Sequence, residues 1–174
     1  MRTLYEVCKL IEGYYDIAWP DYFDLVAEVE WTQPVPHDLL FSGGVDADET
    51  AYFYSIIAYL NKQWWPYYIG MVFDQYASVR NQQKDHRDRL AKLQNRHPGV
   101  TFSITLGTPF FRAGRLTRDS VSAIEGILIY GHWHDGMINE RRINRFSHAK
   151  QIFVRNIGWH EHVESEIAYG VFYR

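Results

Sequence analysis

The stretch PYYIGMVF (Pro66–Phe73) closely follows a second aromatic stretch, TAYFYSI (Thr50–Ile56). Aromatic and β-branched residues dominate both stretches, a proline opens the first, and such runs favour β-strands. Asn61 and Lys62 lie between them and predict the turn of a loose hairpin. Two strands that bring tyrosines to one place form either an active-site platform or an ordinary aromatic strand pair. The segments that follow decide between these readings.

The chain beyond this hairpin alternates between helix and strand signals. A polar, basic helix is expected over 79–96. A strand is expected over 100–111, VTFSITLGTPFF, after the turn at Pro98-Gly99. A second helix is expected over 117–133, apolar on one face and with Glu125 inside it. The predicted order is therefore strand, strand, helix, strand, helix.

Residues of recognisable chemistry fall into this order: Tyr54, the triplet Tyr68-Ile69-Gly70, the basic helix, Glu125 followed by Leu128-Ile129, and Asn139. This ordered set resembles the GIY-YIG nuclease family, whose pattern is a GIY strand, a YIG strand, a helical arginine, a helical glutamate and a later asparagine. The resemblance covers roughly residues 50–140, a normal size for one small domain. It implies an α+β fold in which a small antiparallel three-stranded sheet is flanked by helices, a β-β-α-β-α core with N- and C-terminal additions.

The resemblance also implies an activity, that of a divalent-metal-dependent endonuclease that hydrolyses phosphodiester bonds in DNA. Tyr54 takes the place of the GIY tyrosine, although Tyr52-Phe53-Tyr54 lacks the glycine of that motif, and Tyr68 takes the place of the YIG tyrosine. In this family a motif tyrosine is thought to accept the proton of the attacking water. A free tyrosine has a pKa near 10, so that role requires nearby positive charge or metal-bound water.

The predicted basic helix supplies candidates for binding phosphate. Arg80 lies ten residues beyond the YIG glycine, about where the family places its arginine. A guanidinium can bind phosphate oxygens with two bonds and stabilise charge that develops in the transition state. The family often adds a histidine one turn later, whereas this chain has Lys84 there and places His86 on the apolar stripe. The second phosphate ligand is therefore left open among Lys84, His86 and Arg87.

Glu125 follows the family pattern as the sole protein ligand of one divalent ion, Mg²⁺ or Mn²⁺. A lone acid beside an apolar stripe is costly to bury unless it is paired or binds a metal. Mg²⁺ suits one carboxylate because it keeps several of its waters, and the ion would act as a Lewis acid. Asn139 is expected to support the geometry of the site, with Asn144 as the alternative position. The competing interpretation of Glu125 is an ordinary solvent-facing helical acid.

The charge of the chain is divided between two parts. Residues 1–50 carry two basic residues against eleven acids, a formal charge of −9, and residues 51–174 carry sixteen against ten, a charge of +6. Such asymmetry points to contact with nucleic acid through the basic part. No acid interrupts the stretch 141–155, whose first basic residues are Arg141, Arg142 and Arg145. This stretch is either a track for a phosphate backbone or a solvated face.

The chain divides into an acidic N-terminal extension (1–49), the nuclease-like core (50–145) and a C-terminal strand pair (146–174). The extension either masks the basic face or serves as scaffold. We expect a cytoplasmic protein without a membrane partner, because it has one cysteine, no signal-peptide pattern and no apolar run long enough to span a bilayer. The expected partner is DNA, double-stranded in preference to single-stranded or RNA. One active site per subunit hints at a homodimer.

Two alternatives remain open from the sequence. The first is a GIY-YIG-like domain that binds nucleic acid or a protein without cutting, which the missing glycine and displaced histidine favour. The second is a zinc site, suggested by His132-x-His134-Asp135 and His160-x-His162. Zinc needs three or four converging ligands. Pairs at i, i+2 share a face only on a strand, whereas His132 is expected at a helix end.

Overall fold

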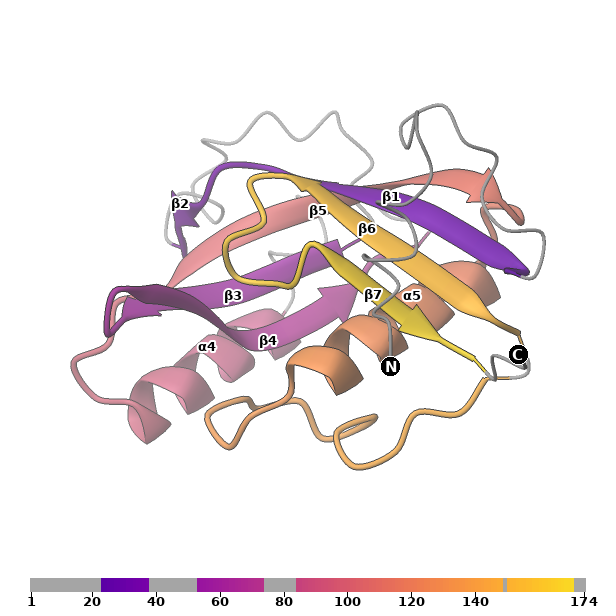
Figure 1. Ribbon diagram of the computed structural model, residues 1–174. Helices are drawn as coiled ribbons and strands as arrows, with labels where there is room; N and C mark the ends of the chain where they lie inside the picture. The colour runs from indigo at the N-terminus through magenta and orange to yellow at the C-terminus, as the bar shows by residue number, and fades with distance from the viewer. Residues whose placement is uncertain (1–22, 38–52, 74–83, 149, 171–174) are drawn as a thin grey trace.

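The computed structural model describes residues 23–37, 53–73, 84–148 and 150–170 (Figure 1). Its strands are β1 (Leu25–Trp31), β2 (Val35–Pro36), β3 (Phe53–Leu60), β4 (Gln63–Met71), β5 (Ser103–Ala113), β6 (Ile152–Gly158) and β7 (Glu166–Tyr169). Its helices are α4 (Lys84–Arg96) and α5 (Arg118–His132). Neither of these helices is long and apolar enough to cross a membrane.

All the described strands belong to one mixed sheet that curls into a half-barrel (Figure 1). The strand order is β4-β3-β5-β1-β6-β7, and the short β2 pairs with β5. β1 lies at the centre, antiparallel to β5 and parallel to β6. β4 and β7 form the two ends of the sheet, so β4 has one edge that no described strand covers.

The predicted fold class, a small three-stranded sheet flanked by helices, is wrong. The described chain is mostly β, with seven strands in one sheet and two helices. The error lies in β1 and β6, which were expected outside the core and instead pair with each other in the middle of the sheet. Strand periodicity identifies the buried face of a strand but not its partner, and these partners lie more than 120 residues apart, Leu25 opposite Ile152. β1 also belongs to the acidic segment 1–49, so this part of the segment is built into the sheet.

The β3–β4 hairpin forms where the sequence predicts it. Asn61 and Lys62 are its two turn residues, with φ of 54° and 66°, between the paired residues Leu60 and Gln63. Two consecutive residues with positive φ are the signature of a type I′ turn, whose twist matches that of the flanking strands. Farther along the hairpin, Tyr54 lies opposite Gly70. The turn sets the register up to Ile57 opposite Pro66, and a β-bulge between Ile56 and Ile57 then shifts it by one residue, which brings Tyr54 opposite Gly70.

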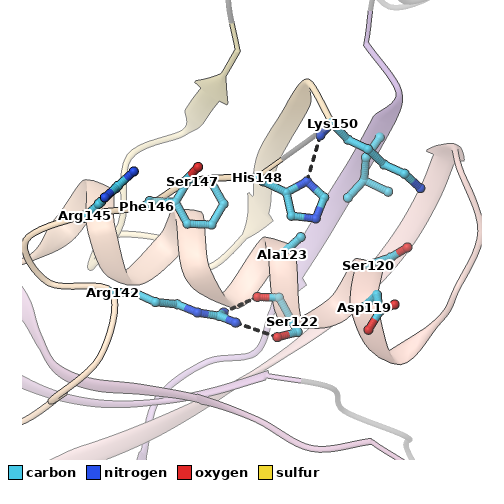
Figure 2. A pocket seen from close by; sticks show the side chains of 11 residues that line it. Asp119, Ser120, Ser122, Ala123, Arg142, Arg145, Phe146, Ser147, His148 and Lys150 are labelled. Atoms are coloured by element: carbon cyan, nitrogen blue, oxygen red, sulfur yellow. Dashed lines mark hydrogen bonds between the residues drawn. The ribbon is translucent and has the colours of Figure 1, made fainter.

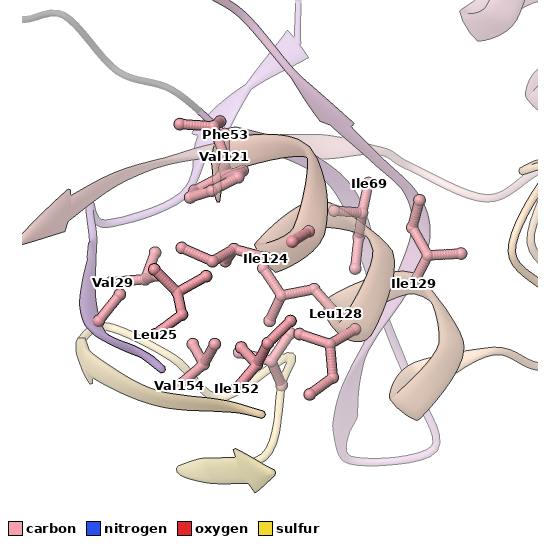
Figure 3. Close-up of a cluster of buried hydrophobic side chains, with 14 of the residues drawn as sticks. Leu25, Val29, Phe53, Ile69, Val121, Ile124, Leu128, Ile129, Ile152 and Val154 are labelled. Carbon is pink, nitrogen blue, oxygen red and sulfur yellow. The ribbon is translucent and has the colours of Figure 1, made fainter. Parts of the chain in front are cut away.

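The sheet has a buried cluster on each face, and each helix covers one of them. α5 starts at the N-cap Thr117, whose hydroxyl accepts the N–H of Ser120 at 3.1 Å. Its buried stripe packs against residues of β1, β3, β4 and β6 (Figure 3). Leu90 and Leu93 of α4 belong to the second cluster, together with Tyr54. Because alternate residues of β3 point to opposite faces, Phe53 joins the α5 cluster and Tyr54 joins the α4 cluster.

Candidate active site

Polar groups from elsewhere in the chain bind the uncovered edge of β4, and the side chains of Asn139 and Glu125 are two of them. Asn139 uses its amide twice, because its Nδ2 donates to the Ile69 carbonyl at 2.8 Å and its Oδ1 accepts the Ile69 N–H at 3.1 Å. Two residues along, the Met71 N–H donates to the carboxylate of Glu125. Asn139 and Glu125 therefore replace a neighbouring strand on either side of Gly70.

Tyr54 and Tyr68 meet over Gly70. Tyr54 comes from β3 and Tyr68 from β4, and their ring centroids lie 5.7 Å apart. A Cβ added to Gly70 would lie 2.7 Å from Cζ of Tyr54 and from Cε1 of Tyr68. Only glycine leaves room for both rings, so the third position of the YIG triplet requires glycine for a steric reason. The two predicted tyrosines thus share one site.

Arg89 of α4 supplies the guanidinium of this site. Its Nη1 donates to the Tyr54 hydroxyl at 3.1 Å, and its Cζ lies 4.9 Å from the centre of the Tyr68 ring. Its positive charge also lowers the pKa of Glu125. The predicted arginine, Arg80, lies outside the described residues, and sequence reasoning did not select Arg89. The available signal was its spacing, because Arg89 lies four residues before the buried Leu93 and so borders the face of α4 that packs on the sheet.

Glu125 is a half-buried carboxylate with incomplete pairing. Burial raises its pKa above the usual range, against the opposing effects of Arg142, the Met71 N–H and Arg89. Arg142 Nη1 lies 3.2 Å from Oε2 of Glu125, and the same guanidinium donates to the carbonyl of Ser122 and, at 2.6 Å, to its hydroxyl. Gly126 permits this approach, since a Cβ there would lie 2.8 Å from Arg142 Nη1.

The donor set at this edge fits one kind of metal ion. Among the described residues, no group of three or more His, Cys, Asp or Glu side chains converges as a metal site. Glu125 is thus the carboxylate available beside the tyrosines, and Arg142 engages only its Oε2. A single carboxylate suits Mg²⁺ or Mn²⁺, which can retain water as the remaining ligands, and does not suit zinc.

The histidines that suggested zinc are engaged in the fold. The Nδ1 of His132 lies 2.7 Å from the Leu128 carbonyl, and its Nε2 accepts the Glu164 N–H at 2.8 Å. His134 likewise contacts the Pro66 carbonyl through Nε2 and accepts a backbone N–H at Nδ1. In both His132 and His134, the two ring nitrogens therefore form hydrogen bonds with backbone groups. His162 is buried elsewhere, against β1, and burial lowers its pKa to about 3.

The remaining predicted residues differ in their exposure and in whether they contact this site. Arg87 and Arg141 are exposed, and so is Asn144, the alternative to Asn139. Lys84 and His86 lie in the first turn of α4. Arg142 is part of the site through Glu125, whereas Arg145 lines a neighbouring pocket.

No protein-family model, curated protein or solved structure matches this chain. Its function must therefore be inferred from its own residues. The site combines two phenols, a guanidinium in contact with both, and a half-buried carboxylate at the same strand edge. A guanidinium can bind a phosphate oxygen, and a carboxylate can hold a cation.

Proposed function

We propose that this protein is a divalent-metal-dependent endonuclease that hydrolyses phosphodiester bonds in DNA, by chemistry like that of the GIY-YIG nucleases. One observation carries the proposal. Side chains from β3, β4, α4, α5 and the segment after α5 gather around Gly70 at the edge of β4, namely Tyr54, Tyr68, Arg89, Glu125 and Asn139. These types are those that the sequence resemblance requires, with Arg89 as the helical arginine.

Arg89 has two roles in this proposal. Its guanidinium contacts both tyrosines, so its positive charge lies where a tyrosine would take the proton of the attacking water. A guanidinium can also bind a non-bridging oxygen of the scissile phosphate. As negative charge builds on that oxygen in the transition state, the interaction with the guanidinium strengthens.

Glu125 and Asn139 have holding roles. Glu125 would bind the divalent ion, which when bound acts as a Lewis acid on a phosphate oxygen. Asn139 fixes the backbone at Ile69, directly between Tyr68 and Gly70. It therefore holds in place the segment of β4 that bears Tyr68. The N–H of Met71, the next one along this edge of β4, donates to Glu125.

A second function has one observation in its favour. Arg142 occupies one oxygen of the Glu125 carboxylate, which weakens the attraction of that group for a cation. A domain that binds DNA or a protein without cleavage would have this arrangement permanently. The two functions differ in whether metal-dependent cleavage occurs.

Plasmid nicking tests the proposal directly. Purified protein is incubated with supercoiled DNA in Mg²⁺, in Mn²⁺ and in EDTA, at low and moderate salt. We expect nicking with either ion and none in EDTA, and we expect Glu125→Gln to lose nicking while it still binds DNA. Binding without cleavage of plasmid, single-stranded DNA or RNA would favour the non-cutting domain. Equal loss of cleavage and binding in Glu125→Gln would contradict the metal-binding role.

A further inference from the structure

A pocket of about 450 Å³ opens beside Glu125, between the first turns of α5 and the segment that follows residue 141 (Figure 2). Its polar lining comes mainly from Ser120, Ser122, Arg142, Arg145, His148 and Lys150. Leu25 and Phe146 contribute apolar wall. The pocket is thus lined by polar and apolar surface in similar measure, and it lies apart from the edge of β4.

The charge of this pocket is strongly positive. Three basic side chains line it, against a single acid, Asp119. Arg145 and Lys150 are exposed, and in the described part of the chain neither has an acidic partner. The hydroxyls of Ser120 and Ser122 in the wall are already engaged, by Thr117 and by Arg142. Two cations without acidic partners in one hollow favour an anion with several oxygens, such as a phosphate.

Arg142 connects the pocket to the candidate active site. Its guanidinium donates to Ser122 in the pocket wall and forms the ion pair with Glu125. Ser122 and Glu125 lie three residues apart on α5, which is an axial rise of roughly 4.5 Å. An anion in the pocket would therefore lie close to one beside Glu125.

We propose that this pocket is a second phosphate subsite, which binds a backbone phosphate of the cleaved DNA strand close to the scissile bond. The proposal rests on the proposed nuclease function and names a part of its substrate contact. Arg145 and Lys150 bind the phosphate by charge, and Arg142 positions the same strand over Glu125. The subsite carries no base recognition, because the groups that line it contact phosphate oxygens.

The test compares two double variants that remove the same charge. Arg145→Gln with Lys150→Gln empties the pocket of its exposed cations, and Lys62→Gln with Lys92→Gln removes two lysines at a hairpin turn and on α4. Binding of a fluorescent duplex is measured in EDTA over a range of salt. Each phosphate contact contributes about −0.9 to the slope of log K against log salt. We expect the pocket variant to flatten the slope by about 1 and to weaken binding about 10-fold, and the control to change both much less. Equal effects of the two variants would overturn the proposal.

Two further measurements separate this proposal from the nuclease function. With saturating plasmid, we expect the pocket variant to keep kcat and to raise KM about 10-fold. If wild-type protein fails to nick but the pocket variant still flattens the salt slope, the nuclease function fails and the phosphate subsite stands. If wild-type protein nicks and the slope is unchanged, the subsite fails alone. Calorimetry with inorganic phosphate completes the test, because binding as tight as that of the duplex would overturn the assignment to a DNA strand.

Discussion

Two half-buried carboxylates, Glu125 at the edge of the sheet and Glu28 at its centre, have opposite surroundings. Glu28 on β1 accepts two bonds from Arg112, at 2.9 and 2.5 Å, and lies 3.7 Å from Arg155. Glu125 has one arginine at 3.2 Å and a backbone N–H, and burial still raises its pKa. The charge of Glu28 is fully compensated by the fold, whereas Glu125 retains capacity for a further cation. We infer that the centre of the sheet is scaffold and that the edge of β4 is the working region.

This contrast gives each region its own response to mutation. Substitutions of side chains at the β4 edge should reduce activity more than stability, because these side chains would bind or position the ligand. Side chains around β1 should affect stability and leave activity intact.

The largest effect after loss of Glu125 is expected from Arg89→Met. The substitution removes the charge that touches both tyrosines and keeps a side chain of similar length, so we expect nicking to fall by about 10²- to 10³-fold. The control is Lys92→Met in the same helix, whose exposed bond to Glu140 should contribute little. Nicking rates and thermal melting of both variants are compared. Activity of Arg89→Met near that of the control would remove Arg89 from the site.

A smaller effect is expected from Gly70→Ala. Its Cβ would lie 2.7 Å from both tyrosine rings, so the rings must move apart and we expect nicking to fall about 10-fold or more. The matched change at the centre of the sheet is Gly107→Ala, whose Cβ would lie 3.0 Å from Trp31. There we expect a loss of roughly 1–3 kcal/mol of stability from overpacking, with nicking retained. Reversed results, with activity lost only in Gly107→Ala, would contradict the division between edge and centre.

The smallest effect on activity is expected from His162→Phe. His162 packs between Trp31 and Trp159, and neither ring nitrogen has a hydrogen-bond partner among the described residues. Its pKa is lowered from 6.5 to about 3, so between these pH values the unfolded chain binds a proton that the folded chain does not. Stability therefore falls as the pH falls through this window, by at most about 1.4 kcal/mol per pH unit.

Phenylalanine cannot bind this proton and leaves no unpaired nitrogen in the same space. We expect His162→Phe to lose less Tm than wild type between pH 7 and pH 4.5 and to nick plasmid at the wild-type rate. An equal loss of Tm in both proteins would show that His162 does not cause the acid sensitivity.

The sequence predicted the local parts of this structure well. The hairpin turn at Asn61 and Lys62, the strand that became β5 and the helix that became α5 all follow from nearby residues. Tyr54, Tyr68, Glu125 and Asn139 could be selected because their types and order resemble a known pattern. The structure brings them to one edge, which residue order alone does not require.

The distant relationships could not be read from the chain. The parallel pairing of β1 with β6 joins residues more than 120 positions apart, as in Val26 opposite Phe153, and no local pattern specifies such a partner. Arg89 was missed because spacing from Gly70 favoured Arg80, while the orientation of α4 decides which arginine reaches Tyr54. The basic stretch after residue 141 was visible, but its folding into a pocket against α5 depends on packing.

The most direct measurement compares Glu125→Gln with Glu28→Gln for plasmid nicking and thermal stability. We expect Glu125→Gln to abolish nicking with Tm near that of wild type. We expect Glu28→Gln to nick at nearly the wild-type rate and to lose roughly 1–3 kcal/mol of stability, because the half-buried Arg155 beside it keeps one charged partner fewer. Full nicking by Glu125→Gln, or loss of nicking in a stably folded Glu28→Gln, would contradict the assignment of the active site to the edge of β4.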